Sequence, residues 1–266
     1  MENFISKLHE WLNWPYKLHI KKTGNGPTII LLHGIATSSA SWEHLIPYLK
    51  SNFTCITIDL IGFGESQKPS WYAYTPEEHV KNIHYTISRL KLKEPFVLVG
   101  HSMGGLLALH YAKKHPDKIK HLFMLSPPIY LSKKDVRNAR KIWRDTLYAQ
   151  AYKYIRLHKK FTLNGARGLK ILALKNNPFS ITDETWLAFS KSLEECIEKQ
   201  NVVQDLIRIN CPIDIFYGTL DQLLIKNNIR KLQGRKNIHL HALRSGHLVS
   251  DKYARIVAER ISYTQA

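Results

Sequence analysis

The chain has 266 residues, of which 44% are hydrophobic and 23% are charged, and no apolar run reaches the length of a membrane-spanning helix. This composition is typical of a globular protein and excludes a disordered chain, a collagen-like chain and a coiled coil. At the N-terminus no basic segment leads into an apolar stretch, so we expect no secretory leader. The three cysteines, Cys55, Cys196 and Cys211, have neither metal-binding nor disulfide spacing. We therefore expect a cytoplasmic protein without a metal site.

The formal net charge of +18 is the unusual feature of the composition. It is concentrated between Leu131 and Lys175, where 13 lysines and arginines stand against two acidic residues. Such a stretch could attract anionic substrates or an anionic membrane surface, but most charge runs are solvated helix faces. We expect no nucleic-acid partner. Only the positive charge of the sequence points to a contact with a membrane surface. The sequence does not predict an oligomeric state.

In chain order, short apolar runs rich in β-branched residues alternate with amphipathic stretches, a pattern that predicts a mostly parallel sheet covered by helices. Buried strands are predicted at Thr28–Leu32, Thr54–Ile58, Phe96–Val99, His121–Leu125 and Ile213–Tyr217, and strands nearer an edge at Tyr16–Lys21 and Ile238–Leu243. Helices are predicted at Ser41–Lys50, Pro76–Lys91, Met103–His115 and Asp251–Tyr263.

The alternation stops after Pro128. From about Leu131 to Leu206 the pattern is helical, including a helix predicted at Asp183–Leu193 with Thr182 as its cap. The strand pattern resumes at Ile213. The sequence thus predicts an α/β core in two parts, residues 1–128 and 207–266, separated by a helical insertion at residues 129–206.

The segment Gly100-His101-Ser102-Met103-Gly104 has the G-x-S-x-G pattern and lies between a predicted buried strand and a predicted helix. A sharp strand-to-helix turn leaves no room for side chains beside the serine, which explains the glycines. The turn would hold the Ser102 hydroxyl clear at the carboxyl edge of the sheet. In that context the pattern indicates a nucleophilic serine.

A serine nucleophile needs a base that is oriented by an acid, and for this motif the expected chain order is serine, acid, histidine. Asp221 follows the strand Ile213–Tyr217 through a glycine turn, and His247 follows the strand Ile238–Leu243. Both lie at strand ends, at the edge that carries Ser102. We take Asp221 and His247 as acid and base.

Other histidines and aspartates fit a catalytic role less well. His239 and His241 alternate with apolar residues and indicate the faces of a strand, and Asp214 lies inside a strand. Asp59 opens the Gly-rich turn Asp59–Ser66, where we expect it to bind the backbone. His101 is expected to pack and hydrogen-bond rather than to act as a catalyst.

Acyl transfer also requires two N–H donors for the oxyanion. Met103, directly after the nucleophile, is expected to supply one, and Ile35 in the loop that opens with His33-Gly34 the other. Substrate contacts are expected from His33, Trp143 and Tyr148. Further aromatic residues of the insertion are candidates for an apolar pocket wall: Tyr152, Phe161, Phe179, Trp186 and Phe189.

Taken together, these motifs resemble the α/β-hydrolase superfamily, in its serine-nucleophile, esterase- and lipase-like branch. The resemblance implies an eight-stranded, mostly parallel sheet with a helical cap inserted after the sixth strand, and the triad Ser102, Asp221 and His247. Ser102 stands where haloalkane dehalogenases and epoxide hydrolases carry aspartate, which disfavours both reactions. The implied function is a cofactor-independent hydrolase of a small-molecule carboxylic ester.

Several alternatives stay open at this point. The same nucleophile could act on a thioester, amide or lactone, or on a carbon–carbon bond, although carbon–carbon bond hydrolases often carry asparagine at position 101. A non-catalytic binding protein of the same fold is a further reading. Finally, a positive rim that attracts anionic substrates is a hypothesis for the basic part of the insertion: Lys133, Lys134, Arg137, Arg140, Lys141 and Arg144.

Overall fold

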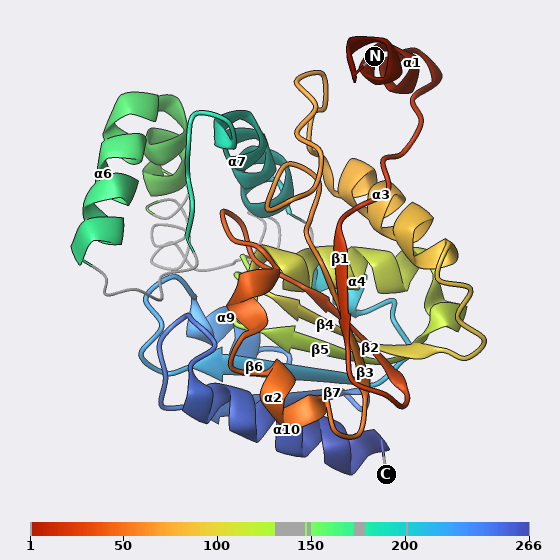
Figure 1. Cartoon of the computed structure of the whole chain (residues 1–266). Helices are drawn as coiled ribbons and strands as arrows, with labels where there is room; N and C mark the ends of the chain where they lie inside the picture. Colours follow the sequence, from red (N-terminus) through yellow and green to blue (C-terminus); the bar gives the residue numbers. More distant parts are fainter. Residues whose placement is uncertain (1, 131–146, 148–149, 173–178, 201, 266) are drawn as a thin grey trace.

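The computed structural model of the chain describes residues 2–130, 147, 150–172, 179–200 and 202–265. A twisted seven-stranded sheet runs through its centre in the order β1-β3-β2-β4-β5-β6-β7 (Figure 1). β1 pairs antiparallel with β3, and every other pairing is parallel. The strands are β1 (Ile20–Thr23), β2 (Thr28–Leu32), β3 (Thr54–Ile58), β4 (Phe96–His101), β5 (Ile119–Leu125), β6 (Ile213–Gly218) and β7 (Ile238–Leu243).

This arrangement confirms the predicted fold class, with seven strands in the described residues where the resemblance implied eight. Ahead of β1, where a further edge strand would pair, the chain forms helix α1 (Glu2–Leu12) and then an irregular segment. In that segment the Tyr16 N–H donates to Asn82 Oδ1 at 2.6 Å and the Leu18 N–H to Thr86 Oγ1 at 2.9 Å. The predicted strand therefore begins only at Ile20, because side chains of a helix take its first backbone donors.

Helices cover both faces of the sheet (Figure 1). α3 (Pro76–Ser88) and α4 (Met103–Lys114) lie on one face, and α2 (Ile46–Leu49) and α10 (Asp251–Gln265) lie on the other. Besides α1, the other described helices are η1 (Ser39–Trp42), η2 (Pro116–Lys118), α6 (Lys159–Leu172), α7 (Trp186–Ser192), η4 (Leu193–Glu198), α8 (Val202–Leu206) and α9 (Lys226–Arg230). η1, η2 and η4 are short, η4 being a π-helix. No helix among the described residues is both long and apolar enough to cross a bilayer.

Three helix predictions differ from the structure in their boundaries. Helix α3 ends at Ser88, three residues earlier than predicted. The predicted helix Ser41–Lys50 is split into η1 and α2, because Pro47 lacks an N–H and fits only near a helix start. Helix α7 begins at Trp186, three residues later than predicted. The predicted cap Thr182 instead accepts the Thr185 N–H at 3.3 Å and closes the turn that leads into the helix.

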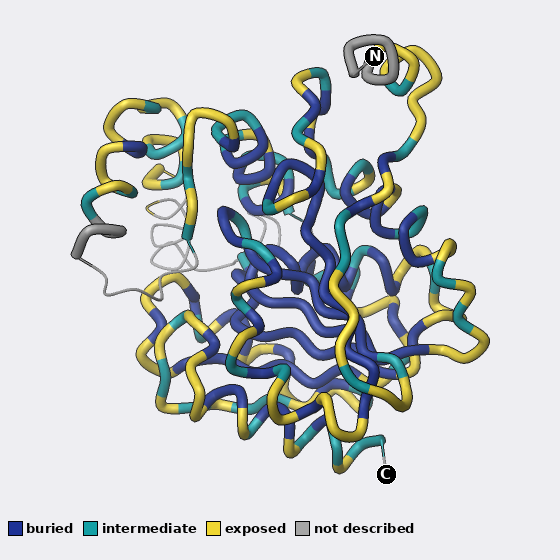
Figure 2. Tube along the Cα trace, in the orientation of Figure 1, coloured by how far each residue is buried: buried dark blue, intermediate teal, exposed yellow. Residues whose placement is uncertain are grey.

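The core has two halves because successive strand residues point to opposite faces of the sheet. Ile30 and Leu32 of β2 pack with α3 and α4, whereas Ile29 and Leu31 pack on the other face with α2 and α10. All four residues are fully buried, and Figure 2 shows the central strands of the sheet as the buried centre of the molecule. The sheet edge at the carboxyl ends of the parallel strands is thereby held as a rigid platform.

The close approach of the start of helix α4 to the end of strand β2 fixes the geometry of that edge. A side chain at Gly104, in the first turn of α4, would overlap the carbonyl oxygens of Leu32 and His33 at the end of β2. A side chain at Gly100 would overlap the Gly104 carbonyl. The helix start can therefore lie directly against β2 only with glycine at both positions.

We expect Gly104→Ala to lower the free energy of unfolding by about 1–3 kcal/mol or more, because α4 must move away from β2. The measurement is urea unfolding. Gly168→Ala is the matched control: an added Cβ there meets nothing within 4 Å, and replacing a helical glycine should stabilise the protein by roughly 0.5–1 kcal/mol. Equal stability of the two variants would contradict this account of the turn.

Candidate active site

Ser102 occupies the turn between β4 and α4 in a strained backbone conformation, with φ 52° and ψ −122°. Positive φ is costly for a residue with a side chain. The turn is held because the Ser102 N–H donates to the Leu125 carbonyl of β5 at 2.8 Å. The backbone turn predicted from the G-x-S-x-G pattern is therefore present, and Ser102 stands at the carboxyl edge of the sheet.

The structure brings the predicted serine, histidine and aspartate into one hydrogen-bonded chain. His247 Nε2 lies 3.0 Å from Ser102 Oγ, and His247 Nδ1 lies 2.7 Å from Asp221 Oδ2. The buried Asp221 carboxylate can only accept, so Nδ1 carries the proton and Nε2 is left to accept from the serine hydroxyl. The other carboxylate oxygen, Oδ1, accepts the Leu223 N–H at 2.8 Å, which fixes the orientation of Asp221.

The loops that carry the acid and the base are bonded to each other. The Thr219 N–H donates to the Leu243 carbonyl at 2.7 Å, and the Leu220 N–H donates to the Ser245 carbonyl at 3.0 Å. A side chain at Gly218 would overlap the Ser245 carbonyl. Glycine at this strand end therefore lets the β6 and β7 loops lie close enough for Asp221 to reach His247.

His101, the residue before the serine, is buried and supports the same loop. Its Nε2 lies 2.9 Å from the His247 carbonyl oxygen, to which it donates a hydrogen bond. Burial, the largest cause, and the neighbouring His247 lower the pKa of His101 to about 3. His101 is therefore neutral at physiological pH. It is a packing and hydrogen-bonding residue, as the sequence predicted.

The sequence predicted that His33 would contact substrate. In the structure, His33 lies inside the protein instead. Its ring is fully buried, Nε2 accepts the Leu60 N–H at 2.9 Å, and Nδ1 lies 2.7 Å from the Gly34 carbonyl oxygen. Burial lowers the pKa of His33, which keeps the ring neutral with its proton on Nδ1. Both ring nitrogens are thus used inside the protein, and His33 holds the loop that begins at Gly34.

That loop lies directly beside the serine. A Cβ on Gly34 would be 3.2 Å from Ser102 Cβ, and the next residue, Ile35, lines the same cavity as Ser102. Met103 is the first residue of α4, and the first N–H groups of a helix have no partner within it. The two residues predicted to donate to an oxyanion therefore flank Ser102.

Asp59 binds the backbone of its own turn, as expected. Its carboxylate accepts the N–H groups of Ser39 at 2.7 Å and Glu65 at 2.9 Å, together with the Ser39 hydroxyl. Burial opposes ionisation, but these hydrogen bonds lower the pKa of Asp59 on balance. The turn in turn positions Leu60, whose N–H binds His33.

Two further rivals, Asp214 and His241, also have structural roles. Asp214 is fully buried in β6, where its carboxylate lies 2.6 Å from His121 Nε2 and 2.5 Å from His241 Nε2, and accepts from Arg260 Nε at 2.8 Å. These hydrogen bonds and the arginine charge hold the pKa of Asp214 well below its usual range despite burial. Asp214 and His241 therefore belong to an ion network inside the fold, separate from Ser102.

A cavity of about 430 Å³ opens at Ser102 and His247, within the range of roughly 300–1,000 Å³ that is usual for small-ligand pockets. Gly34, Ile35 and Thr37 form the wall on the core side. The opposite wall comes from the segment between β5 and β6 and is mainly apolar: Tyr152, Ile155, Phe161, Thr162, Gly165, Ala166, Phe179, Ile181, Phe189, Leu193 and Ile197.

Four of the five further aromatic residues expected at the pocket wall lie in that lining, and Trp186 is absent from it. Trp186 packs beside Phe189 with 5.8 Å between ring centroids. Trp143, Tyr148 and the six basic residues of the proposed rim lie outside the described residues. Sequence reasoning missed Ile155, Leu193 and Ile197, whose helical spacing in the insertion was the available signal.

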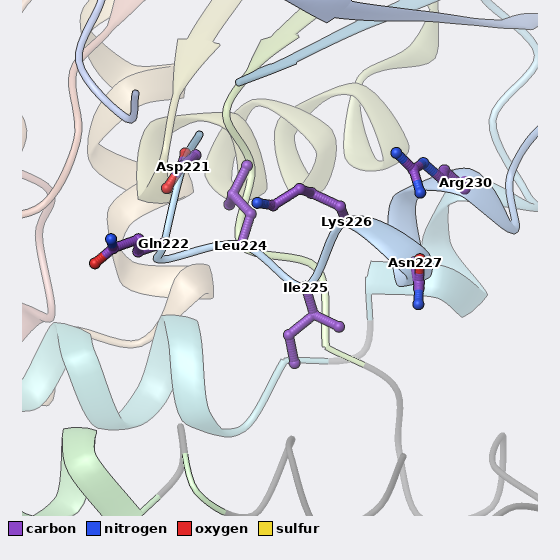
Figure 3. A pocket seen from close by; sticks show the side chains of 7 residues that line it. All are labelled: Asp221, Gln222, Leu224, Ile225, Lys226, Asn227 and Arg230. Carbon is purple, nitrogen blue, oxygen red and sulfur yellow. The ribbon is translucent and has the colours of Figure 1, made fainter. Parts of the chain in front are cut away.

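A second hollow, of about 570 Å³, begins at Asp221 and differs in character (Figure 3). It is lined by Gln222 and by polar side chains of α9 such as Lys226 and Arg230, and Lys226 Nζ donates to the Thr219 carbonyl at 2.8 Å. Neither Ser102 nor His247 lines it. The cavity that opens at Ser102 is therefore the mainly apolar one.

Comparison with known proteins identifies the fold family. Residues 27–169, more than half of the chain, match the family described as the alpha/beta hydrolase fold. The chain belongs to this family. Over its whole length it resembles a crystallised hydrolase from Pseudomonas aeruginosa PA01, with a TM-score of 0.74, 18% identity and 94% of each chain covered.

Two curated relatives show how the similarity is distributed along the chain. A stretch of 123 residues, 44% of this chain, is 43% identical to the probable lysophospholipase BODYGUARD 2 of Arabidopsis thaliana. The matched part spans only about a quarter (26%) of that relative's length. The uncharacterized hydrolase YugF of Bacillus subtilis is 24% identical over 262 residues, 93% of this chain and 92% of YugF.

We expect His33→Ala to lower the free energy of unfolding by about 1–3 kcal/mol, because it leaves the buried Leu60 N–H without its acceptor, whereas the Gly34 carbonyl keeps the Thr37 hydroxyl as a donor. Urea unfolding measures this loss. Thr37→Val is the control, because the Thr37 hydroxyl also binds the Gly34 carbonyl, at 2.9 Å, but leaves the bond between His33 and Leu60 intact. A loss for His33→Ala no larger than for Thr37→Val would contradict the assigned role.

Proposed function

We propose that this chain is a hydrolase that cleaves carboxylic esters with an apolar acyl group through an acyl-enzyme on Ser102. One observation carries the proposal: the hydrogen-bonded chain from Asp221 through His247 to Ser102 opens into a cavity with a mainly apolar wall. Identity to a probable lysophospholipase supports an ester as the substrate class, because lysophospholipids are carboxylic esters. The overall likeness to YugF supports a hydrolase of similar size.

In the proposed mechanism Ser102 Oγ attacks the ester carbonyl while His247 Nε2 takes its proton. Asp221 stabilises the imidazolium that forms and keeps the ring in the required tautomer. The N–H groups of Ile35 and Met103 would stabilise the oxyanion. His247 then protonates the leaving alcohol, and a water molecule, deprotonated by His247, releases the acid. These steps call on side chains and backbone of the chain alone.

We propose further that residues 129–206 form a cap over this site, between the two parts of the core. Most of the cavity wall opposite Ser102 comes from this segment. The Ser180 N–H also donates to the Ala36 carbonyl at 2.7 Å, which joins the segment to the loop that carries Ile35. A cap in this position would shield the acyl-enzyme from bulk water and set the size of the acyl group.

We expect Ser102→Ala to abolish hydrolysis of p-nitrophenyl butyrate and labelling by a fluorophosphonate probe, while circular dichroism stays unchanged. Ser126→Ala is the matched control, because Ser126 is also a buried serine at a strand end with positive φ, 48°, but its hydroxyl lies 3.3 Å from Tyr253 Oη. The control should keep both activities. Wild-type turnover by Ser102→Ala would overturn the proposed mechanism.

The same assays test the role of Asp221 and distinguish ester hydrolysis from the alternative functions. Asp221→Asn should reduce kcat on the order of 10⁴-fold, because the ring of His247 loses its orienting acceptor. A wild-type protein that the probe fails to label would favour a non-catalytic binding protein. Labelling with turnover of thioesters, amides, lactones or carbon–carbon bonds, but not of esters, would assign one of those reactions instead.

Gly165 is the residue through which we propose to test the acyl cavity. It lies on α6 and lines the cavity, and a Cβ at this position would meet nothing within 4 Å. Gly168, one turn further along α6, has equally open surroundings but does not line the cavity. The two glycines form a matched pair with the same helical context.

We expect Gly165→Leu to reduce kcat/KM for long-chain p-nitrophenyl esters by roughly 10- to 100-fold relative to the acetate, because its side chain fills acyl space. Gly168→Leu should leave the ratio of long- to short-chain activity as it is in the wild type. Activity measured across acyl lengths gives both ratios. Parallel changes in the two variants would show that this cavity does not hold the acyl chain.

A further inference from the structure

Helix α1 carries an apolar face that the rest of the described structure leaves uncovered. Leu8, Trp11 and Leu12 stand at helical spacing and are 39%, 81% and 44% exposed, and Trp14, just beyond the helix, is 50% exposed. Figure 1 shows α1 standing clear of the body at the N-terminal end of the chain. Exposed tryptophans are unusual on a protein surface in water, so this face indicates a binding site for a partner.

The face is held in place by contacts on another side of the helix. His9 stacks on the buried Tyr16 with ring centroids 4.0 Å apart. The Trp14 N–H donates to the His9 carbonyl at 2.9 Å, and Asn13 ends the helix with φ 46°. Lys81 Nζ from α3 donates to the Asn13 carbonyl and, at 3.1 Å, to Asn13 Oδ1. These contacts orient α1 and leave Trp11 and Leu12 facing outward.

The surroundings of this face are basic. Residues 1–22 contain four lysines against two glutamates, and Lys7, Lys17, Lys21 and Lys22 are all exposed. The whole chain carries a formal net charge of +18. A partner that suits both the apolar face and this charge must offer an apolar interior behind a negatively charged surface.

We propose that α1 together with Trp14 binds the surface of an anionic lipid bilayer, with its apolar face at the boundary between headgroups and acyl chains. Amphipathic helices with tryptophan and leucine on one face and lysine nearby bind in this way, and each lysine near an anionic surface adds about 1 kcal/mol. Tryptophan suits the boundary because its ring is apolar and its N–H is polar.

A second copy of the chain fits this face less well. Stable protein interfaces bury roughly 1,200–2,000 Å² in total, more than four side chains of one short helix can cover. The excess of lysines would also repel an identical charged surface. The proposal concerns binding alone and does not depend on the proposed hydrolase activity.

The test is co-sedimentation of the full chain with vesicles of phosphatidylcholine and with vesicles of phosphatidylcholine containing phosphatidylglycerol. Wild-type protein should bind the anionic vesicles and show a blue shift of tryptophan fluorescence. Trp11→Ser/Trp14→Ser should bind more weakly, on the order of tenfold for each tryptophan, because each ring loses its burial in the bilayer. Circular dichroism and melting temperature should be unchanged, since both side chains are exposed.

The matched control is Tyr263→Ser, which removes a 77% exposed aromatic ring from α10, at the opposite end of the molecule in Figure 1. It should bind as the wild type does. Wild-type protein that stays in solution with anionic vesicles, or equal binding by the double variant, would overturn the proposal. So would a concentration-dependent dimer that the double variant abolishes, because the face would then belong to a second copy.

Discussion

The close approach of α4 to the end of β2 is the constraint on which the rest of the site depends. Gly100 and Gly104 let the helix start lie directly against the Leu32 and His33 carbonyls, and the turn between them forces Ser102 into positive φ. The bond from the Ser102 N–H to Leu125 secures that turn to β5. A strained serine is stable here because the largely buried strands β2 and β5 fix β4 on both sides.

Hydrogen bonds between loops then bring distant residues to this serine. The β6 and β7 loops bond to each other, which holds Asp221 beside His247, and His101 joins the His247 loop to the serine turn. On the other side of Ser102, the Asp59 turn holds Leu60, and Leu60 holds His33 and with it the Gly34–Ile35 loop. Buried polar groups outside the hydrogen-bonded chain of Ser102, His247 and Asp221 thus provide the preorganisation that the proposed catalytic role requires.

Charge and apolar surface are divided between different parts of the molecule. Buried ionisable groups such as Asp59 and Asp214 are paired within the fold, whereas most lysines of the described part of the chain are exposed to solvent. Apolar surface is exposed in the cavity at Ser102 and, independently, on α1. The proposed acyl cavity and the proposed lipid-binding helix would together suit a substrate that partitions into membranes.

The sequence by itself determined the fold class, most strand positions and the three residues, Ser102, Asp221 and His247, that the structure joins in one hydrogen-bonded chain, because strand periodicity, glycine turns and the G-x-S-x-G pattern are local signals. Only the tertiary structure decided which segments meet. His33 became a buried support because Leu60, 27 residues away, donates to its ring, and the first predicted strand shortened because α3 side chains take its N–H groups. Likewise, local periodicity cannot distinguish a covered helix face from an open one, and the exposure of Trp11 followed only from how His9 and Lys81 hold α1.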